Sequence, residues 1–410
     1  RYDKTLDLRT TGKNFGNAYH VANSNWHSIH RPVTEELLTS GTMPKYEEEY
    51  IYYNKYKKSK TTASMRYFHN KIKHELIEYA SKLESGPGTM LDMAVGKGGD
   101  IRKWFYNKNI RFVLGIDVST DNIENKIDGA CKRYIEEQKT KPSDTQAIFL
   151  TGDLSKNIKN GEAFSNPQNA AICASLLGKG MKNKDTIGKI PLENYGIASN
   201  GFNIISCQFA LHYFFKDKIT LKNFMINLVE STAINGLFIG TCYDGKSVYN
   251  LLNEENFKSY EGDELLLSIS KQYENETFPN DSKSLGYAIE IFQESINKPI
   301  TEYLVNFEFF VRIMENYGFV VEKPNENDYF DNGISSFKSL HDKICKQHSI
   351  KMSKNEKSIS FLNNYFIFRK VRNVNIEDVI WDEEEILDTD DIQSISKIEK
   401  PTKIKLKIKK

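Results

Sequence analysis

Five short apolar runs, separated by helix-like or polar stretches, constrain the fold of this chain most. Each run has the length of one strand, and each separating segment is long enough to cross over a sheet. Strands that alternate with such segments form a parallel sheet built from βαβ units. The composition of the first run favours a central strand that is covered on both faces. The runs are TMLDMAV (89–95), RFVLGIDV (111–118), AIFLTGD (147–153), FNIISCQFAL (202–211) and GLFIGTCYD (236–244).

The other segments add helices, two insertions and two late strands. Residues 154–200 are rich in Asn, Lys, Gly and Ser and are interpreted as an insertion or long loop, and residues 245–300 as a second insertion. Late strands are expected at VVEKP (320–324) and YFIFRK (365–370). Residues 50–84 are basic and then helical in period, and a helix is also expected at 217–234. The buried face of the earlier helix would be formed by Ile72, Leu76, Ile77 and Ala80.

The composition sets broad limits. The 410 residues are 39% hydrophobic, so a sizeable core can form, and the formal net charge of +1 neither favours nor excludes nucleic acid. The five cysteines are scattered without a CxxC pair. This spacing argues against a zinc ribbon and fits a reducing cytosol. No apolar run reaches about 18 residues and no signal-peptide pattern is present, so we expect no membrane partner.

A glycine turn, GKGG (96–99), follows the first expected strand. In a doubly wound sheet, ligands bind at the carboxyl ends of the central strands. Asp117 ends the second strand, 21 positions after Gly96, and an acid at about that spacing contacts ribose hydroxyls. Asp153 ends the third strand, where an acid suits an adenine amino group. Three strand ends thus predict a nucleoside site.

Two ligand classes share this arrangement: a dinucleotide such as NAD, and S-adenosylmethionine. The dinucleotide fingerprint G-x-G-x-x-G/A is not met, because the sixth residue counted from Gly96 is Ile101, and a count from Ala94 begins with alanine. Asp100 would repel a pyrophosphate, whereas nearby acids suit a sulfonium and an amino group. The sequence favours a methyltransferase over a dehydrogenase. A turn that only packs a helix on the sheet is the purely structural alternative.

The fourth expected strand continues as SCQFALHYFF (206–215). A single histidine there would more often be structural. Gln208, His212 and Tyr213 together, just past a strand end, are better interpreted as a set that lines a ligand site.

Several motifs together resemble those of the messenger-RNA cap guanine-N7 methyltransferases. GKGGDIRKW is similar to the family's GKGGDxxKW turn, SCQFALHYFF to its SCQFxxHY segment, and RYFHNKIK (66–73) to an upstream helix with an FNNWxK-like core. The resemblance spans about residues 60–370. Further matches follow in order: GIDVS, TGDLSK, CKRY (131–134), ITEYLVNF (300–307) and NNYFIF (363–368).

This resemblance implies a fold, a cofactor and residue roles. The fold would be the class I S-adenosylmethionine-dependent methyltransferase fold, which is α/β and Rossmann-like, with a mostly parallel sheet, a late antiparallel strand and a cap-binding insertion near 245–300. S-adenosylmethionine would be the methyl donor, S-adenosylhomocysteine the product, and no metal is expected. The cofactor would be held by Lys73, Ala94, Gly96, Asp117, Asp153, Gln208 and Tyr213; the cap would be bound by His69, Asn70, Lys97, Lys103 and Arg133; and His212, Glu302 and Tyr365 would position the guanine.

The chain departs from the family pattern at two places. His69-Asn70 stands where the family usually has Asn-Asn, and MAVGKGG stands where it usually has LGCGKGG. The second change puts Ala94 in place of a glycine. We expect this to be a small steric change that leaves activity intact.

The chemistry of the implied reaction needs positioning groups and no catalytic dyad. Guanine N7 already has a free lone pair, so no general base is required, and alignment of N7, the methyl carbon and sulfur is sufficient. Glu302 suits the N1 and N2 edge of the base, and the basic side chains suit the triphosphate. Tyr365 would close over the base. Without the resemblance, Glu302 would be interpreted as part of a solvated helix face.

The ends of the chain predict its context. Arg1-Tyr2-Asp3-Lys4 fits R-x-D-K, which resembles the last motif of capping guanylyltransferases. We therefore expect residues 1–50 to be an extension that follows a guanylyltransferase, 51–370 to be the methyltransferase domain, and 371–410 to be a tail. The resemblance is to large DNA virus capping enzymes, which also carry a triphosphatase. This resemblance implies capped RNA and a stimulatory subunit as partners. It also implies a location in the host cytoplasm, in viral factories and in the virion.

Two other patterns leave alternatives open. Lys126-Ile127-Asp128-Gly129 matches the nucleotidyl-lysine motif K-x-D-G, but the domain that should surround such a motif is missing, so we interpret it as chance. The basic segment KYKKSK (55–60) is either an RNA contact or a solvated flank. The competing functions are a methyltransferase for another substrate and a non-catalytic cap- or RNA-binding subunit.

Overall fold

The computed structural model describes residues 61–82, 88–252, 256–294, 298–326 and 328–381. All of them belong to one of two compact units of the chain, Tyr50–Lys410. The predicted extension at 1–50, the segment 55–60 and residues 382–410 of the tail lie outside the described residues. What the sequence predicts for those segments stays a prediction.

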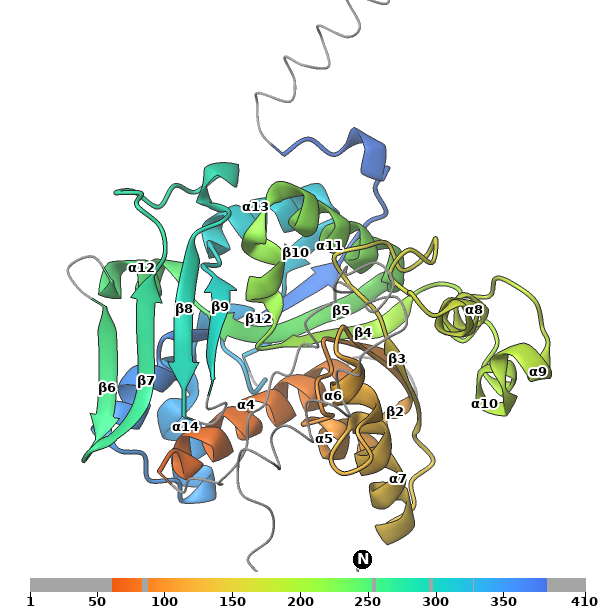
Figure 1. The fold of residues 1–410 in the computed structure, drawn as a ribbon, viewed down its shortest axis with the longest axis horizontal. Coiled ribbons are helices and arrows are strands. Elements are labelled where there is room, and N and C mark those ends of the chain that lie inside the picture. Colours follow the sequence, from red (N-terminus) through yellow and green to blue (C-terminus); the bar gives the residue numbers. More distant parts are fainter. Residues whose placement is uncertain (1–60, 83–87, 253–255, 295–297, 327, 382–410) are drawn as a thin grey trace, which may run out of the picture. The chain divides into compact units, whose positions relative to one another are not determined.

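The predicted mostly parallel sheet with a late antiparallel strand is present (Figure 1). Five strands pair in parallel in the order β5-β4-β1-β2-β3, β12 joins β5 in antiparallel, and β10 and β11 pair with β12. The bounds are β1 (Gly88–Met93), β2 (Ile110–Asp117), β3 (Gln146–Thr151), β4 (Phe202–Gln208), β5 (Thr232–Tyr243), β10 (Phe319–Val321), β11 (Ile334–Ser336) and β12 (Asn363–Lys370).

The second insertion forms a separate antiparallel sheet. Its strands follow each other in the order β6-β7-β8-β9, so every neighbour in the sheet is also a neighbour in the chain. The last of them, β9, contacts the 3-10 helix η1 (Leu211–Lys216) that follows β4. This contact brings the second sheet to the carboxyl ends of the first. The bounds are β6 (Phe257–Glu261), β7 (Glu264–Lys271), β8 (Ala288–Gln293) and β9 (Pro299–Tyr303).

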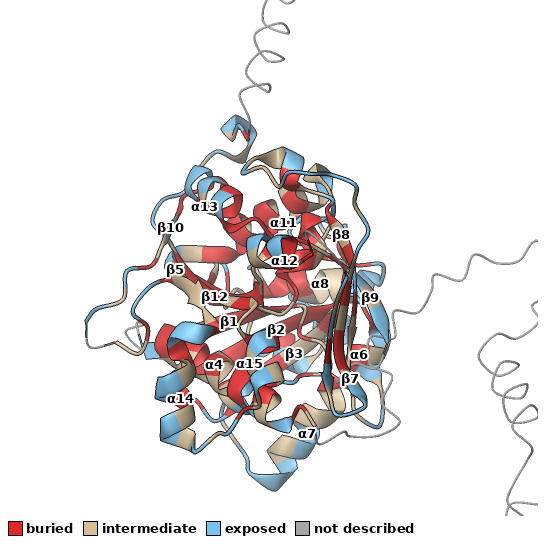
Figure 2. Cartoon of the chain, turned by 90° about the vertical axis from the view of Figure 1, so that its left-hand side faces the viewer, coloured by how far each residue is buried: buried red, intermediate tan, exposed pale blue. Residues whose placement is uncertain are grey.

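Helices cover both faces of the first sheet. One core cluster joins β1 residue Leu91 to α11 residue Phe224, and the other joins Met90 to α4 residue Ile72. Successive residues of a strand point to opposite faces, so adjacent positions of β1 reach different cores. Figure 2 shows the strands in the buried class and the outward helix faces exposed. The helices are α4 (Ala63–Lys82), α5 (Ile101–Phe105), α6 (Thr120–Glu124), α7 (Ala130–Thr140), α11 (Lys218–Ser231), α12 (Gly245–Leu251), α13 (Phe307–Asn316), α14 (His341–His348) and α15 (Lys354–Ser360).

Helix α4 confirms the helical period seen in the sequence. Ile72, Leu76 and Ile77 are fully buried, and the helix packs on β4 and β5. Burial of each such side chain contributes about 1.5–3 kcal/mol. The N–H of Met65 at the start of the helix donates to Glu356 Oε1 at 2.9 Å, and Glu356 is held by a capping box with Ser353. This fixes α4 against α15.

The first insertion is more ordered than the sequence predicts. Residues 154–200 contain three short helices, α8 (Pro167–Leu176), α9 (Lys184–Ile187) and α10 (Lys189–Glu193), so the long-loop alternative is wrong there. Asn166 caps α8 by accepting from the N–H of Gln168, and Pro167 occupies the first helical turn. Figure 1 shows the three helices grouped together.

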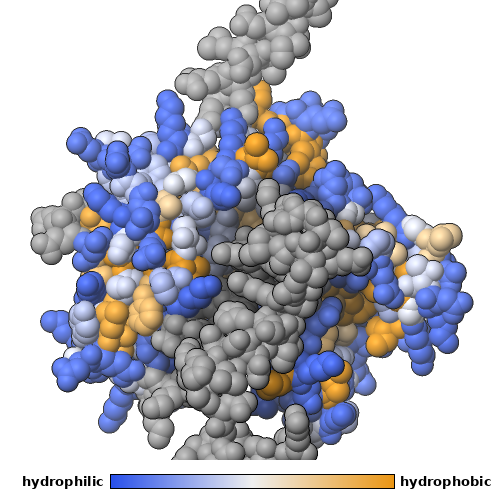
Figure 3. All heavy atoms as spheres, viewed as in Figure 1, coloured by the Kyte–Doolittle hydropathy of each residue, from blue (hydrophilic) through white to orange (hydrophobic). Residues whose placement is uncertain are grey.

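The surface of the described part is mixed. Figure 3 shows hydrophilic side chains over much of the visible face, with separate apolar patches between them. Ile127, Met181 and Ile219 are the most exposed large apolar side chains, each at least three-quarters exposed. None of the described helices is long and apolar enough to cross a membrane. The remaining short 3-10 helices are η2 (Ser282–Ser284), η3 (Phe337–Leu340) and η4 (Ile376–Asp378).

Candidate functional site

The glycine turn leaves an open backbone next to the end of β1. Gly96 has φ +56°, and a Cβ placed there would meet no atom within 4 Å. Gly98 has φ +70°, and a Cβ there would lie 2.4 Å from Ile101 Cδ1. Gly96 therefore keeps space for a ligand beside the backbone, and Gly98 permits the close packing of α5.

Two residues without glycine's freedom adopt positive φ at neighbouring strand ends. Ala94, directly after β1, has φ +62°, and Phe209, directly after β4, has φ +54°. Strands β1 and β4 are paired, so both residues lie at one edge of the sheet. Backbone strain of this kind is found where surrounding structure enforces it, often at functional sites. The sequence analysis missed Phe209, because nothing in the letters marks a phenylalanine for this conformation.

Asp117 is held in place at the predicted strand end. The N–H of Gly96 donates to its Oδ2 at 2.8 Å, and the N–H of Ser119 and the Asn122 amide donate to its Oδ1, each at 2.9 Å. Burial raises the pKa of Asp117, against the three hydrogen bonds that lower it. The carboxylate is thus oriented by the glycine turn and by α6 before any ligand binds. Asn122 is a contributor that the sequence analysis did not single out.

Asp153 also lies after its strand, but it faces its own loop. Its Oδ1 accepts from the N–H of Ser155 at 3.0 Å and from the Ser155 hydroxyl at 2.6 Å. Lys156 is an ion-pair partner at 3.5 Å. The remaining lone pairs of this half-buried carboxylate are the ones that a ligand can use.

Gln208 has a fixed amide orientation at the end of β4. Its Nε2 donates to Ser206 Oγ at 3.1 Å, and its Oε1 accepts from Thr241 Oγ1 at 3.0 Å. The amide therefore presents one further donor and one further acceptor. Thr241 on β5 is another supporting residue that the sequence analysis missed.

A buried pair of polar side chains joins the two sheets. His212 comes from η1 and Glu302 from β9, and His212 Nε2 lies 3.5 Å from Glu302 Oε1 with both side chains 5% exposed. Glu302 Oε2 and both ring nitrogens of His212 have no hydrogen-bond partner among the described residues. The Tyr213 ring packs on His212 at 4.2 Å between centroids. The alternative of a solvated helix face for Glu302 is wrong, since it lies buried on a strand.

Burial keeps this pair uncharged. It raises the pKa of Glu302 to about 8 and lowers the pKa of His212 to about 3. Both groups are therefore neutral near pH 7 in the free protein. Buried polar atoms without partners cost free energy, so this pair is a place where a planar polar ligand would be stabilised.

The predicted cationic cap contacts differ in availability. Lys97 Nζ is 2.8 Å from Asp128 Oδ1 and 3.0 Å from Asp121 Oδ2, with a side chain only 10% exposed. Lys103 is surrounded by protein oxygens. Arg133 on α7 makes no side-chain hydrogen bond or ion pair in the described part of the chain, and it is partly exposed. Of the three, Arg133 is the one ready to contact a phosphate.

The K-x-D-G pattern has a structural explanation. Asp128 pairs with Lys97, and Gly129 begins the approach to α7, where a Cβ would lie 2.7 Å from the Asn125 backbone. Lys126 is exposed on this loop. In the described part of the chain, no second domain lies around Lys126.

Two predicted cap residues lie in packed surroundings. His69 Nε2 is 2.8 Å from Ser360 Oγ, its ring stacks on Phe209 at 5.5 Å, and burial together with Lys73 lowers its pKa to about 3. Tyr365 is 1% exposed and packs on Phe330, with 4.9 Å between ring centroids. Closing over a base would require Tyr365 to leave the core. The closing role expected for Tyr365 stays a prediction.

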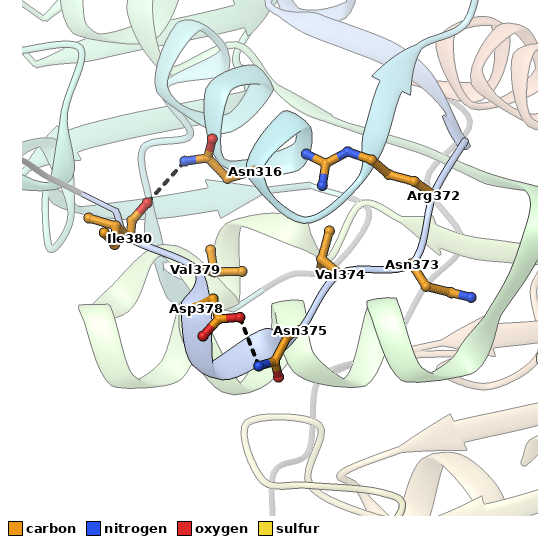
Figure 4. Close-up of a pocket in the computed structure, with 8 residues that line it drawn as sticks. All are labelled: Asn316, Arg372, Asn373, Val374, Asn375, Asp378, Val379 and Ile380. Atoms are coloured by element: carbon orange, nitrogen blue, oxygen red, sulfur yellow. Dashed lines mark hydrogen bonds between the residues drawn. The ribbon is translucent and has the colours of Figure 1, made fainter.

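A surface hollow at the C-terminal end of α13 holds none of the predicted site residues (Figure 4). Its polar side chains are bonded internally: Asn316 donates to the Ile380 carbonyl at 3.0 Å, and Asn375 donates to Asp378 at 2.8 Å. We assign no ligand to it.

Comparisons with known proteins place the chain in a family. Residues 42–371 match the mRNA (guanine-N(7))-methyltransferase domain family. The probable mRNA-capping enzyme of Acanthamoeba polyphaga mimivirus is 27% identical over 92% of this chain, and the match covers 34% of that protein. The mRNA cap guanine-N(7) methyltransferase of Saccharomyces cerevisiae is 27% identical over 70% of this chain and 58% of its own length. The chain thus spans less than two thirds of the length of both relatives.

Solved structures of other methyltransferases also align with the chain. The CcbJ methyltransferase from Streptomyces caelestis covers 73% of this chain and 89% of its own, at 9% identity and a TM-score of 0.41. An S-adenosylmethionine-dependent methyltransferase from Clostridium acetobutylicum covers 86% and 99%, at 10% identity and a TM-score of 0.36.

Proposed function

Because the chain belongs to the mRNA (guanine-N(7))-methyltransferase family, we propose that it transfers the methyl group of S-adenosylmethionine to N7 of the terminal guanosine of capped RNA. The fold is the class I methyltransferase fold implied by the sequence. The proposal extends from the family to this chain's own site residues, and it is carried mainly by the buried pair of His212 and Glu302.

The turn and the strand ends fit S-adenosylmethionine chemically. Asp117 is an oriented acceptor for ribose hydroxyls, and Gly96 leaves open space beside the backbone. Lys73 has one ion-pair partner, Asp100 at 2.7 Å, and so retains donors for a carboxylate. When S-adenosylmethionine is bound, it supplies an electrophilic methyl group on its sulfonium. Gln208, with one donor and one acceptor to spare, completes a donor set that suits both the amino acid and the nucleoside parts.

The pair of His212 and Glu302 fits the edge of a guanine. The base carries two donors on one edge, N1–H and the N2 amino group, and a carboxylate accepts both. Glu302 Oε2 is buried and has no partner in the described residues, so the guanine edge would supply what the free site lacks. A neutral His212 beside it keeps both donor and acceptor capacity for the base or its ribose.

Positioning of the substrates is sufficient for the reaction, because no general base is needed. N7 is a nucleophile without loss of a proton. Holding the base at a fixed distance from the cofactor turn removes the entropic cost of the encounter. Glu302 becomes a better partner as positive charge develops on the base, and such differential stabilisation lowers the barrier.

A methyl-transfer assay with chemically defined acceptors tests the proposal. We expect incorporation into GpppA- and GpppG-ended RNA, no incorporation into the same RNA with a 5′-triphosphate, and the label in 7-methylguanosine after digestion. Calorimetry with S-adenosylhomocysteine runs alongside. A methyl group on ribose or protein would support a different methyltransferase, and lack of binding would support a non-catalytic subunit.

The wider context extends the proposal. R-x-D-K at residues 1–4 and the name of the mimivirus relative support guanylyltransferase and triphosphatase domains on the same natural polypeptide. A stimulatory subunit and action in the cytoplasm of an infected cell, in viral factories and in the virion, belong to the same proposal. Detection of all three capping activities in the natural full-length protein tests it.

A further inference from the structure

The ammonium group of Lys103 has three protein oxygens as close partners. It donates to Asn70 Oδ1 at 2.9 Å and to the Gly99 carbonyl at 3.2 Å, and Asp100 Oδ1 lies 2.6 Å away as an ion-pair partner. An ammonium has three N–H donors; two of them make these hydrogen bonds, and Asp100 Oδ1 is a close ion-pair partner that accepts no hydrogen bond. The side chain is 11% exposed. A phosphate contact would leave several of these oxygens without their cation.

Lys73 contrasts with Lys103 although both meet the same carboxylate oxygen. Lys73 Nζ lies 2.7 Å from Asp100 Oδ1, its one oxygen partner among the described residues, and 5.8 Å from the centre of the Phe209 ring. Two of its donors remain for a ligand. Because Asp100 Oδ1 sits between two cations, removal of Lys103 would let Asp100 and then Lys73 shift.

Asn70 depends on Lys103 for the orientation of its amide. Asn70 Nδ2 donates to the Arg66 carbonyl one turn earlier at 3.0 Å, and its Oδ1 accepts from Lys103. These two contacts decide which way the amide of the exposed Asn70 points. Without the ammonium, the amide would be free to turn over.

The charges in this cluster support a permanent arrangement. Burial lowers the pKa of Lys103, and the two ammonium groups outweigh burial to hold the pKa of Asp100 below its ordinary value. Asp100 is therefore ionised at neutral pH, and its Oδ1 forms ion pairs with both lysines. Helices α4 and α5 contact each other directly (Figure 1), so the cluster spans two elements that carry different predicted ligand contacts.

We propose that Lys103 is a positioning residue that links the two substrate sites: it orients Asn70 toward the cap and, through Asp100, Lys73 toward the cofactor, and it does not contact the cap phosphates. This rests on the proposed function, and it replaces the phosphate role that the sequence resemblance implies for Lys103. Asp100 acquires the role of a shared anchor.

Salt dependence separates a phosphate contact from a positioning residue. Each lost phosphate contact reduces the slope of log affinity against log salt by roughly 0.7–1. We would compare Lys103→Met, Arg133→Gln and the exposed-lysine control Lys108→Met. The readouts are equilibrium binding of GpppG-ended RNA at several salt concentrations and calorimetry with S-adenosylhomocysteine.

The expected results differ for each variant. Lys103→Met should keep the parental salt slope and weaken S-adenosylhomocysteine binding about threefold or more. Arg133→Gln should reduce the slope and leave S-adenosylhomocysteine binding unchanged. Lys108→Met should match the parent in both measurements. A reduced salt slope for Lys103→Met, or unchanged S-adenosylhomocysteine affinity, would overturn the proposal.

Two additions guard against a folding artefact. Asp100→Asn keeps the side-chain shape, and we expect it to weaken S-adenosylhomocysteine binding without changing the salt slope; unchanged binding contradicts the link. The Asn70→Ala and Lys103→Met pair should be non-additive in RNA affinity, and additivity would argue against it. Because these are binding measurements, they remain decisive if the chain fails to methylate capped RNA, which would defeat only the proposed function.

Discussion

Ala94 has a backbone conformation that alanine tolerates poorly, and it has it at the cofactor turn. Its φ of +62° lies in the left-handed region, which costs an L-residue with a Cβ roughly 1–2 kcal/mol. The sequence analysis treated alanine in place of glycine as a small steric change. The structure shows that the cost is conformational, and that the turn is stable enough to bear it.

Ala94→Gly should therefore stabilise the fold. Relief of about 1–2 kcal/mol is opposed by about 0.4–1 kcal/mol from the more flexible unfolded chain, so the net gain in denaturant unfolding is between about 0 and about 1.6 kcal/mol. Ala174→Gly, within helix α8, is the matched control and should lose about 1 kcal/mol. Equal losses for the two variants would show that Ala94 is not strained.

Under the proposed function, Glu302 should make cap binding dependent on pH. Burial raises its pKa to about 8, and the groups around it are neutral His212 from η1 and Tyr243 from β5, whose own pKa is raised by burial and by Glu302. The carboxyl is protonated in the free protein at pH 7, but the guanine edge offers donors and needs an ionised acceptor. Binding of the cap therefore releases a proton.

The affinity for capped RNA should rise with pH from about 6.5 and level off above about 8, by up to tenfold per unit in the steep part. Glu302→Gln cannot ionise and should give a flat profile with weaker binding throughout. Fluorescence binding titrations across this range provide the measurement. A flat profile for the parent protein would mean that Glu302 is already ionised when free.

At the scale of elements, buried lysine Lys370 holds the end of a helix. Its Nζ donates to the Val229 and Thr232 carbonyls at 2.7 and 2.8 Å, at the C-terminus of α11, from the last position of β12. Cations suit this end of a helix, where carbonyls lack partners. The contact fixes α11 to a strand that lies 138 or more positions away in the chain.

Lys370→Met should destabilise the protein by about 1–3 kcal/mol, because two buried carbonyls lose their donor. Burial lowers the pKa of Lys370, so loss of the buried charge offsets part of that cost. Lys346→Met on the exposed part of α14 is the control and should change stability by less than about 0.5 kcal/mol. Denaturant unfolding measures both, and equal stability of the two variants would contradict the capping role.

The sequence predicted the elements with strong apolar signals and missed those whose local signals are weaker. The five parallel strands follow from apolar runs and lie close to the predicted ranges, and α4, predicted from its period within residues 50–84, spans Ala63–Lys82. Residues 154–200 have no such periodicity, and their helices depend on local caps such as Asn166. The antiparallel sheet of the second insertion was not predicted as strands, although each strand pairs with a chain neighbour, because the insertion has mixed polarity.

For the site, sequence and structure agree best where a motif fixes the backbone. Asp117 and Gly96 contact each other as their spacing suggests. Lys97, Lys103 and Tyr365 are the residue types that the family motifs require. In the structure, however, the two lysines form ion pairs with aspartates and Tyr365 packs on an aromatic ring. Those partners lie on other elements, so no local pattern distinguishes a free cation from a paired one.

At the scale of the whole molecule, the site exists because two sheets meet. The first sheet supplies the cofactor turn and His212, and the antiparallel sheet supplies Glu302 through β9. Under the proposed function, the first sheet holds the methyl donor, and Glu302 from the second sheet completes the site that positions the guanine acceptor. This division predicts that loss of Glu302 affects one substrate and spares the other.

Steady-state methylation of GpppG-ended RNA by Glu302→Ala, with S-adenosylhomocysteine affinity measured on the same preparation, tests this most directly. Charge-assisted hydrogen bonds to the base edge contribute about 1.5–3 kcal/mol each, so kcat/KM for capped RNA should fall at least about tenfold. The dissociation constant for S-adenosylhomocysteine should stay within about twofold of the parent. Unchanged kcat/KM, or an equal loss of cofactor affinity, would contradict the assignment of Glu302 to the cap guanine.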